Sequence, residues 1–226
     1  MSLTLYFHPL ASFCHKVLIA LYENGTPFEA QIVDLADPDS SAELLRHWPV
    51  GKIPVLFDDA TGRAIPETSI IIEYLTRHYP GPVALLPNEE DRRLEVRLWD
   101  RFFDLYVSVP MQKIVVDRLR PEGQSDPYGV ADARATLGTA YGMIERQLAG
   151  REWVASSGFS LADCSAAPAL FYASIVEPFG DGRPALTAYF ECLLARPSVA
   201  RTIDEARPYF SNFPYRDAMP ARFLND

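Results

Sequence analysis

The chain has 226 residues, 48% of them hydrophobic, and a formal net charge of −9 at pH 7. This is the composition of an ordinary soluble globular protein, with enough apolar residues for one large or two small packed domains. The negative charge disfavours a general binder of nucleic acids or of anionic membranes, because both functions need a cationic surface.

The N-terminus and the cysteines exclude further classes. The first residues, MSLTLYFHP, contain no basic region, long apolar segment or small-residue cleavage site, so we expect a cytoplasmic protein without a membrane anchor. The three cysteines, Cys14, Cys164 and Cys192, are odd in number and widely spaced. This spacing fits neither a disulfide framework nor a metal cluster, and we predict no metal site.

The first eighty residues alternate between strand and helix patterns. In chain order they predict a strand over 3–7, a helix from Ser12 to the stop at Asn24-Gly25, a strand over 28–33, a short polar helix or turn over 39–47, strands over 55–57 and 63–65, and a helix over 67–78. The order βαβαββα is that of a thioredoxin-like domain, in which one parallel unit and one hairpin unit share a sheet.

The chain after residue 80 is predicted to be helical. Three prolines and a glycine within 79–87 indicate a linker. Beyond it we expect helices over 89–119 and 126–148, and others that begin near 160, 185 and 198. Pro110 should kink the first of them, since its ring displaces a backbone hydrogen bond. We therefore assign 1–80 to the thioredoxin-like domain, 81–87 to the linker and 88–226 to an all-helical bundle domain.

Ser160 and Asp163 form a capping-box pattern ahead of a buried helix. Their side chains can exchange hydrogen bonds with each other's backbone across the first helical turn. A cap explains both residues, so we assign them to folding, with a cost of about 1 kcal/mol for the loss of either one.

Two short motifs indicate a binding site. Pro54 stands where a strand opens, since proline cannot donate to a ladder from its middle, and an Ile-Pro bond is among the few that adopt cis at modest cost. A turn there leaves the backbone of Ile53 free to pair with an extended ligand. Glu67 and Thr68 precede an apolar helix, so they present a carboxylate, a hydroxyl and free N–H groups that suit an α-amino acid. Each motif alone also has a purely structural reading, as a strand opening or a helix cap.

Together and in this order, the two motifs resemble the glutathione-binding half of the glutathione transferases. The Ser160–Asp163 box resembles the one that this family carries in its helical domain, so the resemblance covers nearly the whole chain. It implies the glutathione transferase fold, glutathione as co-substrate, a small hydrophobic electrophile as second substrate, and a two-fold symmetric homodimer.

The resemblance also implies roles for individual residues. Ile53, beside Pro54, binds the cysteinyl backbone of glutathione through its own main chain. Glu67 and Thr68 hold the γ-glutamyl group, and Lys52 takes the glycine carboxylate. Arg46 and His47 are alternatives for that carboxylate.

The activating group is where the chain departs from the family. These enzymes lower the pKa of the glutathione thiol with a hydroxyl donor or with the N-terminus of the first helix. Serine-type classes carry the activating serine six residues before the valine that is Val17 here, and this chain has Ala11 at that place. We predict that Ser12 stabilises the thiolate by its hydroxyl, its backbone N–H or both. The structural alternative, which is compatible with this role, is that Ser12 is the N-cap of the first helix. Tyr6 is the second candidate.

Two functions are compatible with these residues. The leading one is a glutathione transferase that attacks small hydrophobic electrophiles or reduces peroxides, with Tyr106, Pro110 and Met111 as candidate lining of the electrophile pocket. The alternative is a non-catalytic ligand carrier or protein-interaction module, because a fold does not by itself fix an activity. Ala11 favours the alternative, whereas the intact head-group motifs favour retained glutathione binding.

Overall fold

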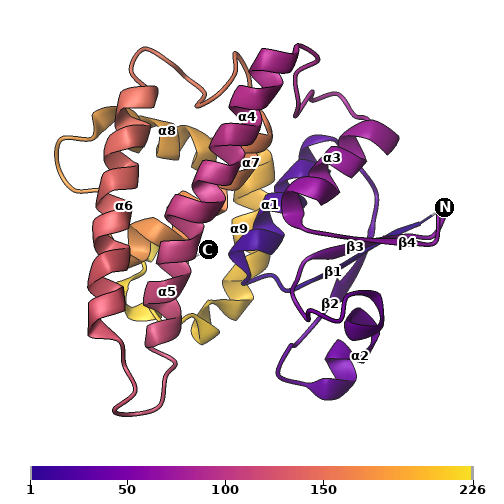
Figure 1. Cartoon of the computed structure of the whole chain (residues 1–226), viewed down its shortest axis with the longest axis horizontal. Coiled ribbons are helices and arrows are strands. Elements are labelled where there is room, and N and C mark those ends of the chain that lie inside the picture. Colours follow the sequence, from indigo (N-terminus) through magenta and orange to yellow (C-terminus); the bar gives the residue numbers. More distant parts are fainter. Residues whose placement is uncertain (1, 225–226) are drawn as a thin grey trace.

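The computed structural model describes residues 2–224, which form an α/β part followed by a helical part (Figure 1). The α/β part contains strands β1 (Leu3–Phe7), β2 (Glu29–Ile32), β3 (Val55–Asp58) and β4 (Arg63–Pro66), and helices α1 (Ser12–Glu23), α2 (Pro38–His47) and α3 (Thr68–His78). The predicted order βαβαββα is confirmed. The outer bounds of the predicted domains, residues 1 and 226, lie outside the described part, and the division at 80 and 87 stays a prediction.

The four strands form one sheet in the order β2-β1-β3-β4. β1 is parallel to β2 and antiparallel to β3, and β3 and β4 form the hairpin. Successive side chains of a strand point to opposite faces. Leu5 of β1 therefore packs into the large core that includes α1 and α3, whereas Tyr6 joins a small cluster with Leu44 of α2.

The helical part follows after residue 89. Its elements are α4 (Glu90–Phe102), the π-helical segment η1 (Phe103–Ser108), α5 (Val109–Asp117), α6 (Pro127–Gln147), α7 (Leu161–Val176), α8 (Pro184–Ala195), α9 (Pro197–Ala206), η2 (Arg207–Asn212), η3 (Arg216–Ala218) and α10 (Ala221–Leu224). Within residues 2–224, none of these helices combines the length and apolar character needed to cross a bilayer.

The long helix predicted over 89–119 is present, but its middle is π-helical. Pro110 lies in the first turn of α5, directly after η1. Proline has no N–H to donate and its ring crowds the preceding turn, so a widened turn in front of it relieves both effects. The regular helix is therefore interrupted directly before Pro110 by a π-helical segment, while the kink expected at Pro110 stays a prediction.

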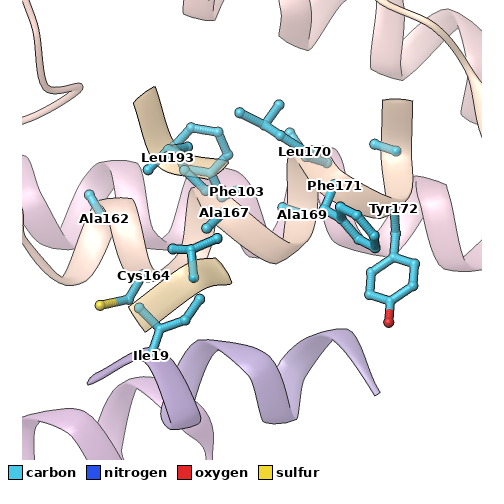
Figure 2. Packing of buried hydrophobic residues seen from close by; sticks show 14 of the residues in the cluster. Ile19, Phe103, Ala162, Cys164, Ala167, Ala169, Leu170, Phe171, Tyr172 and Leu193 are labelled. Carbon is cyan, nitrogen blue, oxygen red and sulfur yellow. The ribbon is translucent and has the colours of Figure 1, made fainter. Parts of the chain in front are cut away.

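Helix α7 forms the centre of the helical part and is buried almost throughout. Its many alanines permit close approach of other elements, and Figure 2 shows Ile19 of α1 beside Cys164, with Phe103 of η1 and Leu193 of α8 around the same helix. The predicted capping box is confirmed at its N-terminus, where Ser160 N–H donates to Asp163 Oδ2 at 2.8 Å.

A buried lysine connects the two parts of the molecule. Lys16 of α1 is 1% exposed, and its Nζ lies 2.6 Å from Asp100 Oδ1 and 2.9 Å from Asp104 Oδ2. Ser69 of α3 accepts from Lys16 at 3.0 Å and donates to Asp100 at 2.6 Å, and Ser165 of α7 also donates to Asp100. Burial raises the pKa of Asp104, and the charge of Lys16 opposes that shift. The network joins α1, α3, α4, η1 and α7.

His15, the neighbour of Lys16, is buried as a neutral side chain. It is 2% exposed, and its Nε2 lies 2.5 Å from the carbonyl oxygen of Pro9, so the ring nitrogen donates. Burial lowers its pKa to about 4. The native state therefore keeps His15 uncharged down to mildly acidic pH.

We expect Lys16→Met to lower the free energy of unfolding by about 3–5 kcal/mol, because it leaves the buried carboxylate of Asp100 without a cation and that of Asp104 with Arg101 alone. Urea denaturation of the whole chain measures this loss. Lys113→Met is the matched control, since Lys113 pairs with Asp126 in a half-exposed position and its loss should be much smaller. Equal losses for the two variants would contradict the structural role of the network.

The stability should also depend on pH through His15. Its pKa is about 4 in the native state against 6.5 in the free side chain, so between these values the unfolded chain binds a proton that the native chain does not. The free energy of unfolding should therefore fall with decreasing pH by up to about 1.4 kcal/mol per unit from this group. Urea unfolding at pH 7, 6 and 5 should show a shallower decline for His15→Gln than for the wild type. Parallel declines would show that His15 does not titrate in this way.

Candidate functional site

A cleft of about 570 Å³ lies between the α/β part and the long helix that follows the linker. The α/β part contributes to its lining Ala11, Phe13, Leu35, Trp48, Lys52, Ile53, Pro54, Glu67 and Thr68, and the long helix contributes Arg101, Asp104, Leu105, Val109 and Gln112. The five residues predicted to bind the co-substrate, at positions 52, 53, 54, 67 and 68, thus line one cleft.

One wall of the cleft is the segment before β3. The Ile53–Pro54 peptide bond is cis, and β3 begins at Val55, which pairs with Tyr6. Within the described part of the chain, the backbone N–H and C=O of Ile53 form no hydrogen bond. The side chain of Lys52 is exposed next to them. This wall therefore offers one free backbone donor, one free acceptor and an ammonium group.

The N-terminus of α3 forms the adjacent wall. Glu67 has a φ of 68°, a left-handed conformation that is uncommon outside glycine and that tends to occur at functional sites. The first backbone bond of α3 runs from Ile71 N–H to Glu67 O at 2.8 Å, so the N–H groups of residues 68–70 have no backbone partner in the described chain. The Glu67 carboxylate makes no capping bond. Free N–H groups at a helix N-terminus favour a bound anion, and the carboxylate beside them favours a bound cation.

The turn from β1 into α1 reaches the cleft through Ala11 and Phe13, while Ser12 does not line it. The prediction of Ser12 as N-cap is wrong, because the N-cap is Ala11, with φ −81° and ψ 118°, and Ser12 is the first helical residue. Ser12 is 7% exposed, and among residues 2–224 neither its hydroxyl nor its N–H has a hydrogen-bond partner. Both donors of Ser12 therefore remain available at the helix start.

Tyr6, the second candidate for the activating group, does not line the cleft. It is 4% exposed and packs under α2, where its hydroxyl lies 3.4 Å from His47 Nε2. Burial raises its pKa to about 12. The alternation of side chains along β1 directs Tyr6 to the α2 face of the sheet, away from α1.

The predicted lining of the electrophile pocket is wrong. Pro110 and Met111 are buried in the core, and Tyr106 is 52% exposed with its ring against Phe102 at a centroid distance of 5.3 Å. The neighbouring face of the same helix lines the cleft instead. The sequence shows two apolar faces on this helix, and only packing against the bundle decides which one is buried. Leu35 and Trp48 were missed because they lie in loops without a periodic signal.

The helical wall is connected to the buried network. Arg101 donates to Asp104 Oδ2 at 3.0 Å, and Asp104 also accepts from Lys16. Cations at Lys52 and Arg101, the Glu67 carboxylate and two helix N-termini surround the cleft. These groups match an elongated ligand with carboxylates and an ammonium, and the apolar side chains of Leu105 and Val109 leave room for a hydrophobic second reactant.

A second hollow, of about 690 Å³, lies on another side of α1. Its lining includes the aromatic side chains of Tyr22, Phe28 and Tyr209 and the charged side chains of Arg201 and Glu205. It contains none of the predicted site residues, and its Arg201 and Glu205 side chains are paired with each other at 2.8 Å. We therefore place the functional site in the cleft at Ile53 and Glu67.

Comparison with known proteins identifies the family of the chain. The family models described as the N-terminal and the C-terminal domain of glutathione S-transferase match residues 11–78 and 127–192. The glutathione S-transferase-like protein LUC7 of Fusarium sp is 32% identical over 165 residues, which are 70% of this chain and 71% of that protein.

Solved structures show the same similarity. A glutathione S-transferase from Methylobacillus flagellatus with bound GSH superposes with a TM-score of 0.81 at 26% identity, covering 89% of this chain and 98% of the other. One from Methylobacterium radiotolerans in complex with glutathione sulfonate gives 0.77 at 30% identity, covering 89% and 94%. The resemblance and the fold class expected from the sequence are confirmed: this chain belongs to the glutathione S-transferase family.

Proposed function

We propose that the chain binds glutathione in the cleft and lowers the pKa of its thiol, so that the thiolate attacks small hydrophobic electrophiles or reduces peroxides. One observation carries this proposal. The two head-group motifs and the start of α1 line a single cleft whose opposite wall is partly apolar. The glutathione and glutathione sulfonate in the two bacterial structures support the same ligand class for this chain.

Each part of glutathione has a proposed partner. The backbone of Ile53, beside Pro54, pairs with the cysteinyl residue, because its N–H and C=O are otherwise unpaired. Thr68 and the N–H groups of α3 take the γ-glutamyl carboxylate, and Glu67 takes the ammonium. Lys52 takes the glycine carboxylate.

The thiolate is proposed to lie at the N-terminus of α1. The N–H groups of Ser12 and Phe13 are free of backbone partners in the described chain, and the helix dipole favours a negative charge there. The Ser12 hydroxyl adds a third donor. In conjugation, the sulfur lone pair forms a bond to the electrophilic carbon and the leaving group departs with its electron pair.

A carrier or interaction module is the second candidate. Ala11 favours it, since a methyl group provides no donor at the cleft position where serine-type relatives carry a hydroxyl. We further infer a cytoplasmic homodimer. The exposed Ile70, Leu94 and Leu98 on α3 and α4 support a protein interface, because large exposed apolar groups on adjacent helices mark such surfaces.

Calorimetric titration with millimolar glutathione tests binding. Thr68→Val should weaken it by about 10- to 100-fold, because a hydrogen bond to a charged carboxylate is lost. Thr139→Val, on the exposed side of α6, is the matched control and should bind like the wild type. Wild-type protein that takes up no glutathione at this concentration would contradict the proposed function.

Thiol activation is tested by following the thiolate absorbance of bound glutathione across pH. Ser12→Ala should raise the pKa of the bound thiol by about one unit if the hydroxyl donates to sulfur. An unchanged pKa would assign the stabilisation to the N–H groups of Ser12 and Phe13. A wild-type complex whose thiol titrates like free glutathione would refute the enzyme and favour the carrier.

A further inference from the structure

The turn between β1 and α1, residues 8–11, contains two consecutive peptide planes that are each held at both ends. In the Pro9–Leu10 plane, the Pro9 carbonyl accepts from His15 Nε2 at 2.5 Å. The N–H of the same plane, on Leu10, donates to His8 Nδ1 at 3.1 Å. Because a peptide group is planar, fixing its two ends fixes its rotation.

The next plane, Leu10–Ala11, is held by the helical part of the molecule. The Leu10 carbonyl accepts from the Tyr172 hydroxyl at 2.9 Å, across 162 positions of sequence. The N–H of this plane, on Ala11, donates to His8 O at 3.0 Å. The turn is thus fixed from α1 through His15 and from α7 through Tyr172.

The next peptide plane, Ala11–Ser12, carries the first N–H group of α1, which has no backbone partner in residues 2–224. The Ala11 carbonyl accepts from the N–H groups of Cys14 at 2.9 Å and His15 at 3.2 Å, while the Ser12 N–H on the opposite side of this plane has no partner in residues 2–224. The direction of the Ser12 N–H therefore depends on the bonds of α1 to the Ala11 carbonyl and on the Leu10–Ala11 plane, which fixes the other side of Ala11.

Tyr172 and His15 form one buried unit. Both are 2% exposed, and their ring centroids lie 5.5 Å apart. Figure 2 shows the Tyr172 ring leaving α7 on the side on which α1 runs. Burial raises the pKa of Tyr172 and lowers that of His15, so both side chains stay neutral donors while a thiol titrates.

We propose that Tyr172 and His15 are positioning residues for thiol activation: they hold the 8–11 turn so that the Ser12 donors point at the glutathione sulfur. This inference rests on the proposed function. Neither side chain lines the cleft, so both act through the backbone of the turn. Activation by the α/β part would then depend on a hydroxyl supplied by the helical part.

The kinetics of Tyr172→Phe separate a role in positioning the thiol-activating donors from a role in glutathione binding. This variant removes only the hydroxyl, so the Leu10 carbonyl loses its partner and the peptide plane can rotate. Glutathione affinity should stay within about twofold, because the head-group contacts are elsewhere. The pKa of the bound thiol should rise by about one unit, so that kcat at pH 6.5 falls by about tenfold and recovers at alkaline pH.

Tyr141→Phe is the matched control. Tyr141 of α6 is also buried in the helical part, and its hydroxyl donates to the backbone carbonyl of Glu177 at 2.9 Å. This hydroxyl makes no hydrogen bond to residues 8–11. Both variants lose the same kind of bond and should show similar losses in Tm. Only Tyr172→Phe should shift the thiol pKa. Identical thiol pKa values in the wild type and both variants would overturn the proposal.

Two further measurements keep the test decisive. His15→Leu removes the donor to the other peptide plane and should give the same rise in thiol pKa, so it decides the matter if Tyr172→Phe fails to fold. Amide hydrogen exchange of the free protein reads the turn without glutathione: Ala11 N–H should exchange faster in Tyr172→Phe than in Tyr141→Phe. If Ala11 N–H exchanges faster in Tyr172→Phe but the wild type does not lower the thiol pKa, only the proposed function is refuted. If the exchange of Ala11 N–H is the same in the two variants, the positioning role is refuted.

Discussion

The placement of Lys16 between Asp100 and Asp104 is the constraint on which the rest of the structure depends. Removing three charges from water is costly, and only close pairing with further hydrogen bonds offsets that cost. Ser69 donates such a bond to Asp100 at 2.6 Å and Ser165 donates another, and the two serines come from α3 of the α/β part and α7 of the helical part. The network links α1 and α3 of the α/β part to α4, η1 and α7 of the helical part, and its Asp104 also lines the cleft.

The two parts of the chain contribute different kinds of groups to the cleft. The α/β part supplies backbone groups, helix N-termini and charges that suit a peptide-like co-substrate, whereas the long helix supplies Leu105 and Val109 as an apolar wall. The boundary is not strict, because Arg101 and Asp104 link the helical wall to the buried network and Tyr172 holds the turn that begins α1. Residues of the α/β part and of the long helix therefore line the same cleft and are linked by hydrogen bonds behind it.

Much of the fold and of the α/β wall of the cleft was predictable because the signals are local. Strand alternation, the Asn24-Gly25 stop and the Ser160–Asp163 box each act within a few residues, and so do the motifs at Ile53-Pro54 and Glu67-Thr68. The lining from the long helix was mispredicted, since Tyr106, Pro110 and Met111 share its apolar character with Leu105 and Val109. Choosing between two apolar faces requires knowledge of what packs against each of them.

The sequence by itself determined the order of the elements, the family resemblance and the two motifs that line the cleft, since short-range geometry governs all three. Tertiary structure alone decided that Lys16 is enclosed by two carboxylates and that Tyr172 reaches Leu10. Those contacts join residues up to 162 positions apart, and no local pattern specifies which distant groups meet when the two parts of the chain pack together.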